Sequence, residues 1–245
     1  MLIHVQNLLK RFGEKTVLRR FNFDVREGEF VALLGPNGAG KSTFLRILSS
    51  LARPTQGLVQ IPGYSLPGEA VQIRSRLGVV SHQPLLYGDL TAQENLQFFG
   101  RLYNIQNMSD RIRQVLELVG LVPRRADLVR TFSRGMQQRL AIGRAVLHDP
   151  EVLLLDEPHT GLDQDAADML DGVLRQVASR GRTVVMTSHD LARAEALATR
   201  FDVLARGRIQ ASADRLQIPT DGLLAFYRQT LEQSARPEPE GYPHE

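Results

Sequence analysis

Apolar and polar side chains alternate at the start of the chain and then give way to short runs rich in apolar residues. From residue 2 to residue 26 the apolar positions follow the strand period on both sides of a turn at residues 13–15. Runs at 30–34, 152–155 and 183–187 have the length and composition of strands buried on both faces. Further strands are predicted at 57–61 and 77–80, with a hairpin over 201–211.

Between residues 91 and 147 the apolar spacing changes to the helical period. Thr91 and Glu94 match a capping box at the start of one helix, and Gly120 ends the helix predicted from residue 110. Other helices are predicted at 43–48, 134–147, 165–180 and 191–199. The chain therefore has an α/β pattern that is interrupted by a helical insertion.

Composition narrows the class of protein. The chain has 245 residues, of which 42% are hydrophobic and 23% charged, as in an ordinary soluble domain. A net charge of only +3 gives no reason to expect a nucleic-acid partner. The absence of cysteine excludes a disulfide framework and thiolate metal sites. No apolar run approaches the roughly 18–20 residues needed to span a bilayer, so we expect another polypeptide to hold the chain at any membrane.

A phosphate-binding pattern, G-x-x-x-x-G-K-[ST], follows the strand predicted at 30–34. Its glycines let the backbone curl so that N–H groups face phosphate oxygens, and the following helix adds its dipole. Lys41 supplies a charge for the β- and γ-phosphates, and Ser42 a hydroxyl for Mg²⁺. The motif consists of Gly35, Pro36, Asn37, Gly38, Ala39, Gly40, Lys41 and Ser42, with Thr43 next in the helix.

An acidic pair, Asp156 and Glu157, directly follows the buried strand at 152–155. The carboxyl ends of parallel strands are where such sheets bind ligands. We expect Asp156 to hold Mg²⁺ through water and Glu157 to act as general base on an attacking water.

A second helix start, at residues 132–139, has the features of an anion site. Ser133 is a good N-cap, and the helix beginning there leaves N–H groups free. Taken alone, the segment would equally fit an ordinary capped helix.

With these segments in view, residues 2–228 resemble the ATP-binding subunit of ABC transporters. Residues 35–43 match the Walker A motif, 152–156 match Walker B, and Glu157 matches the catalytic glutamate. The remaining matches are Phe12 at the adenine-stacking position, Gln83 in the Q-loop, Ser133 to Gln137 in the signature, residues 161–163 including Asp163 in the D-loop, and His189 in the H-loop.

The resemblance implies a P-loop NTPase (RecA-like) α/β core with an antiparallel β subdomain and an inserted helical subdomain. It places one ATPase domain at 1–228, with the core at 1–84 and 151–228 and the helical subdomain at 85–150. Residues 229–245 would form a tail, partly disordered because it is rich in proline and glutamate after residue 234.

The resemblance also implies ATP and Mg²⁺ as cofactors, with Gln83 sensing Mg²⁺ and His189 contacting the γ-phosphate. The signature of one subunit closes the ATP site of another, so a homodimer or a pair with a similar ATPase is expected. Ser133, Gly135 and Gln137 keep the signature pattern, whereas Arg134 replaces its first glycine. That arginine could strengthen ATP binding or merely face solvent.

The expected partner is an integral membrane permease, which would place the chain at the cytoplasmic face of the membrane. Leu85, Leu86, Tyr87 and Leu90 are apolar for a loop; they could pack on the helical subdomain or form a groove for a short helix of the permease. The signature segment and residues 147–150 are most similar to haem exporter ATPases of cytochrome c maturation. ABC-2-type exporters of drugs or polysaccharides are the alternative, and an assembly ATPase is a more distant one.

Four other histidines show no metal-ligand spacing, and a structural or surface role is expected for them. They are His4, His82, His148 and His159. His159 lies between Glu157 and the D-loop.

Overall fold

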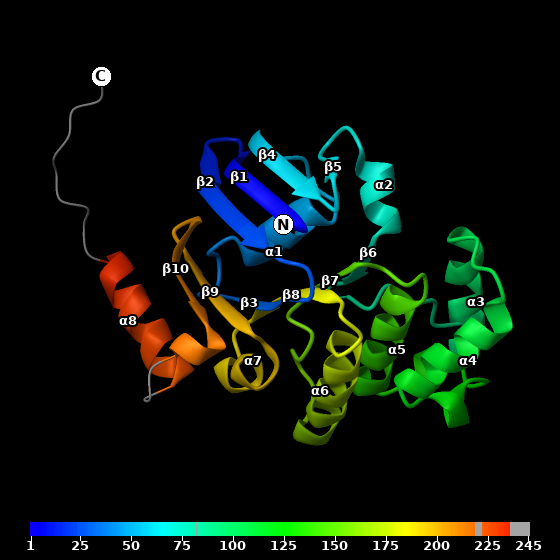
Figure 1. The fold of residues 1–245 in the computed structure, drawn as a ribbon. Coiled ribbons are helices and arrows are strands. Elements are labelled where there is room, and N and C mark those ends of the chain that lie inside the picture. Colours follow the sequence, from blue (N-terminus) through cyan, green and yellow to red (C-terminus); the bar gives the residue numbers. More distant parts are fainter. Residues whose placement is uncertain (82, 219–221, 236–245) are drawn as a thin grey trace, which may run out of the picture.

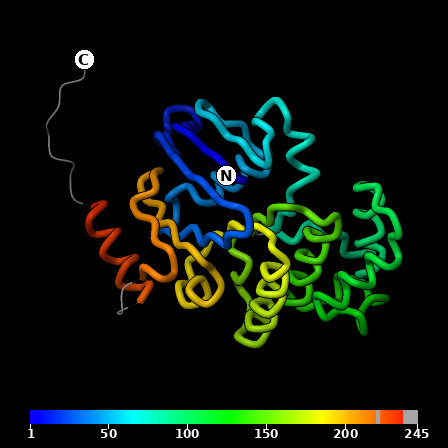
Figure 2. The backbone as a smooth tube through the Cα atoms, viewed as in Figure 1, coloured from blue at the N-terminus to red at the C-terminus, as the bar shows by residue number. Residues whose placement is uncertain are grey.

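The computed structural model describes residues 1–81, 83–218 and 222–235, which form two β-sheets with helices packed around them (Figures 1 and 2). The strands are β1 (Ile3–Phe12), β2 (Lys15–Val25), β3 (Phe30–Leu34), β4 (Gln56–Ile61), β5 (Tyr64–Ser65), β6 (Leu77–Val80), β7 (Val152–Asp156), β8 (Thr183–Ser188), β9 (Arg200–Ala205) and β10 (Arg208–Asp214). The α-helices are α1 (Lys41–Leu48), α2 (Ala70–Ser75), α3 (Ala92–Leu102), α4 (Met108–Leu118), α5 (Arg134–Val146), α6 (Gln164–Ala178), α7 (Leu191–Leu197) and α8 (Leu223–Ala235).

The main sheet has the strand order β10-β9-β3-β8-β7-β6. The strands from β9 to β6 are parallel, and β10 pairs antiparallel with β9 at one edge. Every residue of β3 and β8 is buried, because helices or the second sheet cover both faces. The carboxyl ends of β3, β7 and β8 therefore lie side by side at one edge, where loops can build a site.

The second sheet is antiparallel, in the order β2-β1-β4-β5, and lies over α1 (Figure 1). Phe44 of α1 contacts Phe21 and Phe23 of β2, with ring centroids 4.4 and 4.9 Å apart. The alternating strand pattern near the start of the chain thus supplies the apolar face that covers this helix.

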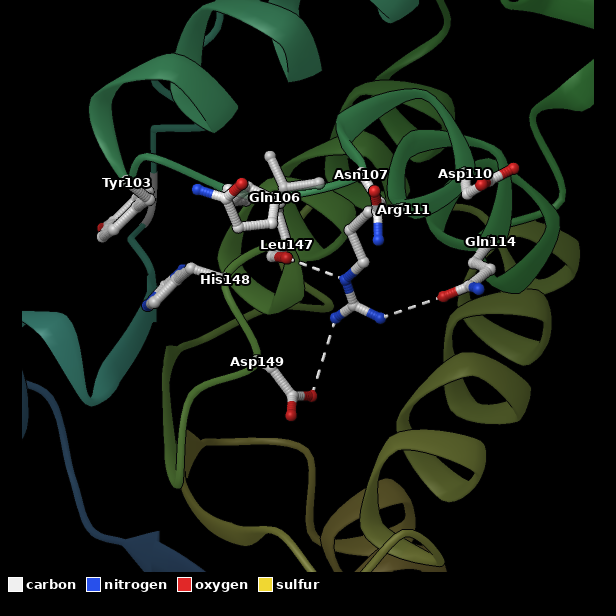
Figure 3. A pocket seen from close by; sticks show the side chains of 10 residues that line it. Tyr103, Gln106, Asn107, Asp110, Arg111, Gln114, Leu147, His148 and Asp149 are labelled. Carbon is white, nitrogen blue, oxygen red and sulfur yellow. Dashed lines mark hydrogen bonds and ion pairs between the residues drawn. The ribbon is translucent and has the colours of Figure 1, made fainter.

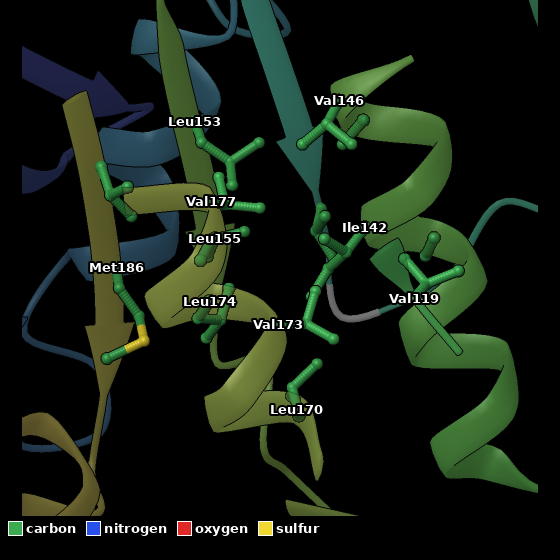
Figure 4. Close-up of a cluster of buried hydrophobic side chains, with 14 of the residues drawn as sticks. Val119, Ile142, Val146, Leu153, Leu155, Leu170, Val173, Leu174, Val177 and Met186 are labelled. Carbon is green, nitrogen blue, oxygen red and sulfur yellow. The ribbon is translucent and has the colours of Figure 1, made fainter. Parts of the chain in front are cut away.

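A large core joins the main sheet to the helices on its other side (Figure 4). Leu153 and Leu155 of β7 meet Leu170 and Leu174 of α6 there, and Ile142 of α5 completes the contact. The helix α5 belongs to the helical insertion with α3 and α4, so this core fixes the insertion to the sheet.

The described part of the chain confirms the predicted α/β core with its antiparallel sheet and its helical insertion. The expected domain bounds stay predictions, and within the expected tail α8 continues past residue 228 to Ala235. Leu223 of this helix is buried in the core, and Phe226 and Leu231 pack against it, so apolar contacts order a segment expected in the tail.

Residues 236–245 of the expected tail lie outside the described residues. No helix within the described ranges is both long enough and apolar enough to cross a bilayer.

Candidate active site

The predicted phosphate loop connects β3 to α1, and two of its glycines have specific steric roles. Gly35 has φ of 155°, and a Cβ there would lie 2.2 Å from the carbonyl oxygen of Leu204 on β9. Gly40 caps α1 in a left-handed conformation, and a Cβ would lie 2.9 Å from Leu18. A side chain at position 35 would clash with backbone, and one at position 40 would strain the backbone, whose φ there is 115°.

Lys41 is the buried cation of this loop, with only 6% of its surface exposed. Its Nζ donates hydrogen bonds to the carbonyl oxygens of Gly35 (2.7 Å) and Pro36 (3.3 Å), and it lies 3.8 Å from Glu157 Oε1. Burial lowers the pKa of Lys41, while the charges of Glu157 and Asp156 oppose that shift. The loop therefore presents a poorly hydrated ammonium group, which is suited to binding an anionic phosphate.

Three oxygen-bearing side chains converge where β7 and β8 end. Ser42 Oγ and Thr187 Oγ1 both donate to Asp156 Oδ1, at 3.0 and 2.7 Å. A hydroxyl and a carboxylate fit Mg²⁺, which prefers oxygen ligands and keeps several waters. Ser42 and Asp156 would hold the ion, which would neutralise phosphate charge when bound.

Glu157 stands at the junction of these groups in a left-handed backbone conformation, with φ of 49°. Its backbone N–H donates to Thr187 Oγ1 at 3.0 Å. Its Oε2 accepts a hydrogen bond from Thr160 Oγ1 and lies 3.2 Å from His189 Nδ1. The carboxylate is thus held beside Lys41, where it can accept a proton from a water near the phosphate.

A pocket of about 260 Å³ opens over the loop. It is lined by the predicted residues Asn37, Gly38, Ala39, Gly40, Lys41, Ser42, Thr43 and Glu157, together with Lys15 and Val17. Lys15 and Val17 come from β2, and the sequence pattern gave no reason to single them out beyond strand periodicity.

Phe12 and Gln83 stand apart from this lining. Phe12 ends β1 and is more than half exposed, with Lys10 Nζ 4.6 Å from its ring centroid. Gln83 is exposed, and its carbonyl oxygen accepts a hydrogen bond from Ser81 Oγ. Their predicted contacts with adenine and Mg²⁺ remain predictions.

The second predicted anion site, at the start of α5, contacts the D-loop segment and not the phosphate pocket. Ser133 caps the helix by accepting from the Met136 N–H at 3.3 Å. Arg134 packs against Gly161, where a Cβ would lie 2.4 Å from the arginine Nη1. A Cβ at Gly135 would lie 2.6 Å from that of Ala166, so this glycine allows α5 to approach α6 closely.

Two other signature and D-loop residues have local roles. Gln137 Nε2 donates to the carbonyl oxygen of Phe132 at 3.2 Å, and Asp163 caps α6 by accepting from the Ala166 N–H at 2.8 Å. The structure thus joins the signature to the D-loop, and Walker A to Walker B, as two separate groups within one chain.

Thr187 is a residue of the site that the sequence interpretation did not single out. It is fully buried and joins the backbone of Glu157 to the carboxylate of Asp156. The available signal was a polar residue at the carboxyl end of a buried strand, beside the strand that carries the acidic pair.

A larger cavity, of about 620 Å³, lies away from this site among α3, α4 and residues 147–149 (Figure 3). Arg111 donates to the carbonyl oxygens of Val146 and Leu147, and the His148 ring stacks on Tyr103 with centroids 3.8 Å apart. Burial lowers the pKa of His148 to about 4, so its ring is neutral at physiological pH and structural in role. His4 pairs with Asp24, and His82 lies outside the described residues.

A lysine-bearing phosphate loop beside an Asp–Glu pair at the edge of a parallel sheet defines a nucleoside triphosphatase. The chain belongs to the ABC transporter family, whose sequence model, described as "ABC transporter", matches residues 18–160. It is an ATP-hydrolysing subunit of that family.

Named relatives and solved structures agree with this assignment. The linearmycin resistance ATP-binding protein LnrL of Bacillus subtilis (strain 168) is 36% identical over 212 residues, which are 86% of this chain and 68% of that protein. The Nod factor export ATP-binding protein I of Ralstonia nicotianae is 40% identical over 209 residues, covering 84% of this chain and 65% of that protein. The chain therefore spans about two thirds of the length of these relatives.

Two solved structures share the fold. The ATP-binding subunit of an ABC transporter superposes with a TM-score of 0.85 at 29% identity, covering 94% of this chain and all of that one. A dimeric ATP-binding cassette in a post-hydrolysis state, bound to ADP and Pi, superposes with a TM-score of 0.78 at 30% identity, covering 87% and 98% of the two chains.

Proposed function

We propose that this chain hydrolyses ATP to drive export through a separate membrane subunit, as the ATPase of an ABC-2-type exporter. The observation that carries the proposal is the convergence of Lys41, Ser42, Asp156 and Glu157 on one pocket edge. Lys41 would bind the phosphates, Ser42 and Asp156 the Mg²⁺, and Glu157 would accept the proton of the attacking water. His189, held against Glu157, would then contact the γ-phosphate.

The active form is a head-to-tail dimer or a pair with a similar subunit. Ser133 and Lys41 belong to different groups of contacts in one chain, so a second copy would bring its signature to this phosphate loop. The dimeric cassette bound to ADP and Pi provides a precedent for such an assembly. Closure would exclude water from the reacting phosphate.

The cargo is inferred from the relatives. Their names concern linearmycin resistance and Nod factor export, and these favour the drug or polysaccharide exporters of the ABC-2 type. Haem export was the main expectation from the signature segment and residues 147–150. None of the relatives named above is a haem exporter, so the ABC-2 alternative takes its place.

The membrane subunit would bind the apolar surface that follows Gln83, at the cytoplasmic face of the membrane. Leu86 packs on the core, and the Tyr87 ring packs edge-on against Phe98, with centroids 4.9 Å apart. Leu85 and Tyr87 nevertheless remain 57% and 49% exposed. Both expectations for this segment thus have support: part of it packs internally, and the rest is available to an apolar helix.

The catalytic assignment is tested by Glu157→Gln. This substitution keeps the size of the side chain but removes the base, so we expect ATP hydrolysis to fall at least about 100-fold while ATP binding persists. Lys41→Ala is the contrasting variant and should weaken ATP binding itself. Steady-state hydrolysis and binding of a fluorescent ATP analogue measure the two effects, and normal hydrolysis by Glu157→Gln would refute the role of the base.

The cargo class is tested by deleting the gene and restoring it as wild type or Glu157→Gln. Loss of an ABC-2-type exporter should raise sensitivity to amphiphilic antibiotics or change surface polysaccharide, and only the wild-type gene should reverse it. Loss of covalent haem from c-type cytochromes, with unchanged drug sensitivity and polysaccharide, would instead support the haem exporter.

A further inference from the structure

The loop that runs from the proposed base through the D-loop contains a buried histidine. This loop, residues 157–163, begins at Glu157 and ends at Asp163, the exposed N-cap of α6. The His159 side chain between them is only 7% exposed, although Gly161 nearby faces solvent. A polar ring withdrawn from water in an exposed loop needs a partner that offsets its desolvation.

That partner is Asp171 on the inward face of α6. His159 Nε2 donates to Asp171 Oδ1 at 2.7 Å, and the Asp171 side chain is only 6% exposed. Nδ1 of His159 is buried with no hydrogen-bond partner within the described part of the chain, so the Asp171 contact fixes the ring. Burial acts to raise the pKa of Asp171, but the hydrogen bonds and charges of His159 and Arg193 outweigh it and hold that pKa below its ordinary value.

Arg193 connects the same carboxylate to α7. Its Nη1 donates to Asp171 Oδ2 at 2.7 Å and to Asp168 Oδ1 at 3.0 Å. Its backbone N–H donates to Asp190, the N-cap of α7, which directly follows His189. The network therefore runs from the segment that carries Glu157 to the segment that carries His189.

The two ends of this network meet again at the site. His189 Nδ1 lies 3.2 Å from Glu157 Oε2, and Thr160 Oγ1 donates to the same carboxylate oxygen. The loop is thus held at two places: at the carboxylate of Glu157, which is its reacting edge, and at the contact of His159 with Asp171, which is its lower contact. Removing the lower contact would leave Glu157 held only at the reacting edge, by Thr160 and His189 at its carboxylate and by Thr187 at its backbone N–H.

We propose that His159 is a positioning residue: through Asp171 and Arg193 it fixes the loop that carries Glu157 relative to His189. The inference rests on the proposed function, because it matters only if Glu157 and His189 act on ATP. It assigns His159 no contact with ATP, so its effect belongs to turnover and not to nucleotide affinity.

The test compares kcat and KM of the full chain for three variants. His159→Leu removes the donor at similar volume, and we expect kcat to fall about tenfold with KM for ATP within about twofold, since a small misplacement of a reacting group is costly. His159→Gln keeps an amide N–H for Asp171 and should restore kcat to within about threefold of wild type. Val177→Ala, on the same buried face of α6 but outside the network, controls for lost stability.

Wild-type kcat in folded His159→Leu, or an equal fall of kcat in Val177→Ala at a matched loss of unfolding midpoint, would overturn the proposal. If His159→Leu does not fold, His159→Asn replaces it. The asparagine side chain is too short to bring its amide to Asp171 from the same backbone position. The same two outcomes then apply. Normal hydrolysis by Glu157→Gln would overturn the proposed function instead, whereas an inactive Glu157→Gln with a normal His159→Leu would refute only the positioning role.

Discussion

Hydrogen bonds hold individual polar side chains of the candidate active site in fixed positions. Lys41 donates hydrogen bonds to two backbone carbonyl oxygens and faces Glu157. On binding a phosphate, its ammonium group would donate to phosphate oxygens in place of these carbonyl oxygens. Thr187 donates to Asp156 and accepts from the Glu157 N–H, so a single hydroxyl sets the spacing of the acidic pair. Preorganised polar groups of this kind lose little free energy to rearrangement when substrate binds.

At the same scale, His148 should make stability depend on pH. Its folded-state pKa of about 4 lies below the ordinary value of about 6.5, because burial outweighs its hydrogen bond to Leu77. The neutral ring therefore stabilises the fold above about pH 6.5, and this contribution is lost as the pH falls toward 4. Between about pH 7.5 and about pH 5, we expect wild type to lose about 2 kcal/mol more unfolding free energy than His148→Phe.

Urea unfolding of both proteins at the two pH values measures that difference. The Phe ring can keep the stack on Tyr103 but does not titrate, so other titrating groups cancel in the comparison. An equal pH dependence in the two proteins would contradict the assignment of a neutral, buried ring.

At the scale of elements, α5 approaches β6 more closely than side chains would allow. A Cβ at Gly78 would lie 2.3 Å from the carbonyl oxygen of Ala145 on α5. Arg144 of α5 donates to the carbonyl oxygen of Val79 on β6 and to that of Leu85 in the loop after Gln83. The helix that begins with the signature is therefore fixed at its other end to the sheet and to the Q-loop segment.

This packing predicts opposite effects for two glycine substitutions. Gly78→Ala must push α5 away from β6, and we expect it to lower the free energy of unfolding by about 1–3 kcal/mol. Gly172→Ala, inside α6, meets no atom within 4 Å and should instead stabilise the protein by about 0.5–1 kcal/mol. Chemical denaturation measures both, and a stabilised Gly78→Ala would show that the close contact is not required.

The elements also show how far the sequence could predict the fold and the site. Buried strands and capped helices have local signals, as Thr91 and Ser133 show, because their caps depend on residues a few positions apart. Contacts between distant segments, such as Thr187 with Glu157 or His159 with Asp171, depend on how the elements pack. Local patterns in one sequence do not reveal which distant segments come together. The course of α8 past residue 228 has no comparably local signal, since Leu223 and its neighbours pack on a core built elsewhere in the chain.

In the whole molecule, the two helix N-termini that were predicted to bind anions lie in different groups of contacts. The start of α1 forms the phosphate pocket, whereas the start of α5 contacts Gly161 and Ala166 near α6. Arg134 lies with this second group, so any contact it makes with ATP would be with nucleotide held by another subunit. The proposed head-to-tail dimer would therefore require a partner that is rotated to bring its α5 to this α1.

Mixing two inactive variants tests that requirement directly. Lys41→Ala loses the phosphate cation, and Ser133→Asp keeps an N-cap for α5 but places a negative charge where phosphate is expected. Ser133→Asn, which caps without charge, is the matched control and should retain most activity. In a head-to-tail dimer, half of the randomly mixed pairs contain one intact site out of two, so ATPase activity should return to about a quarter of wild type. If the two inactive proteins gain no activity on mixing with ATP, although mixed dimers form, the signature does not act across the interface and each chain completes its own site.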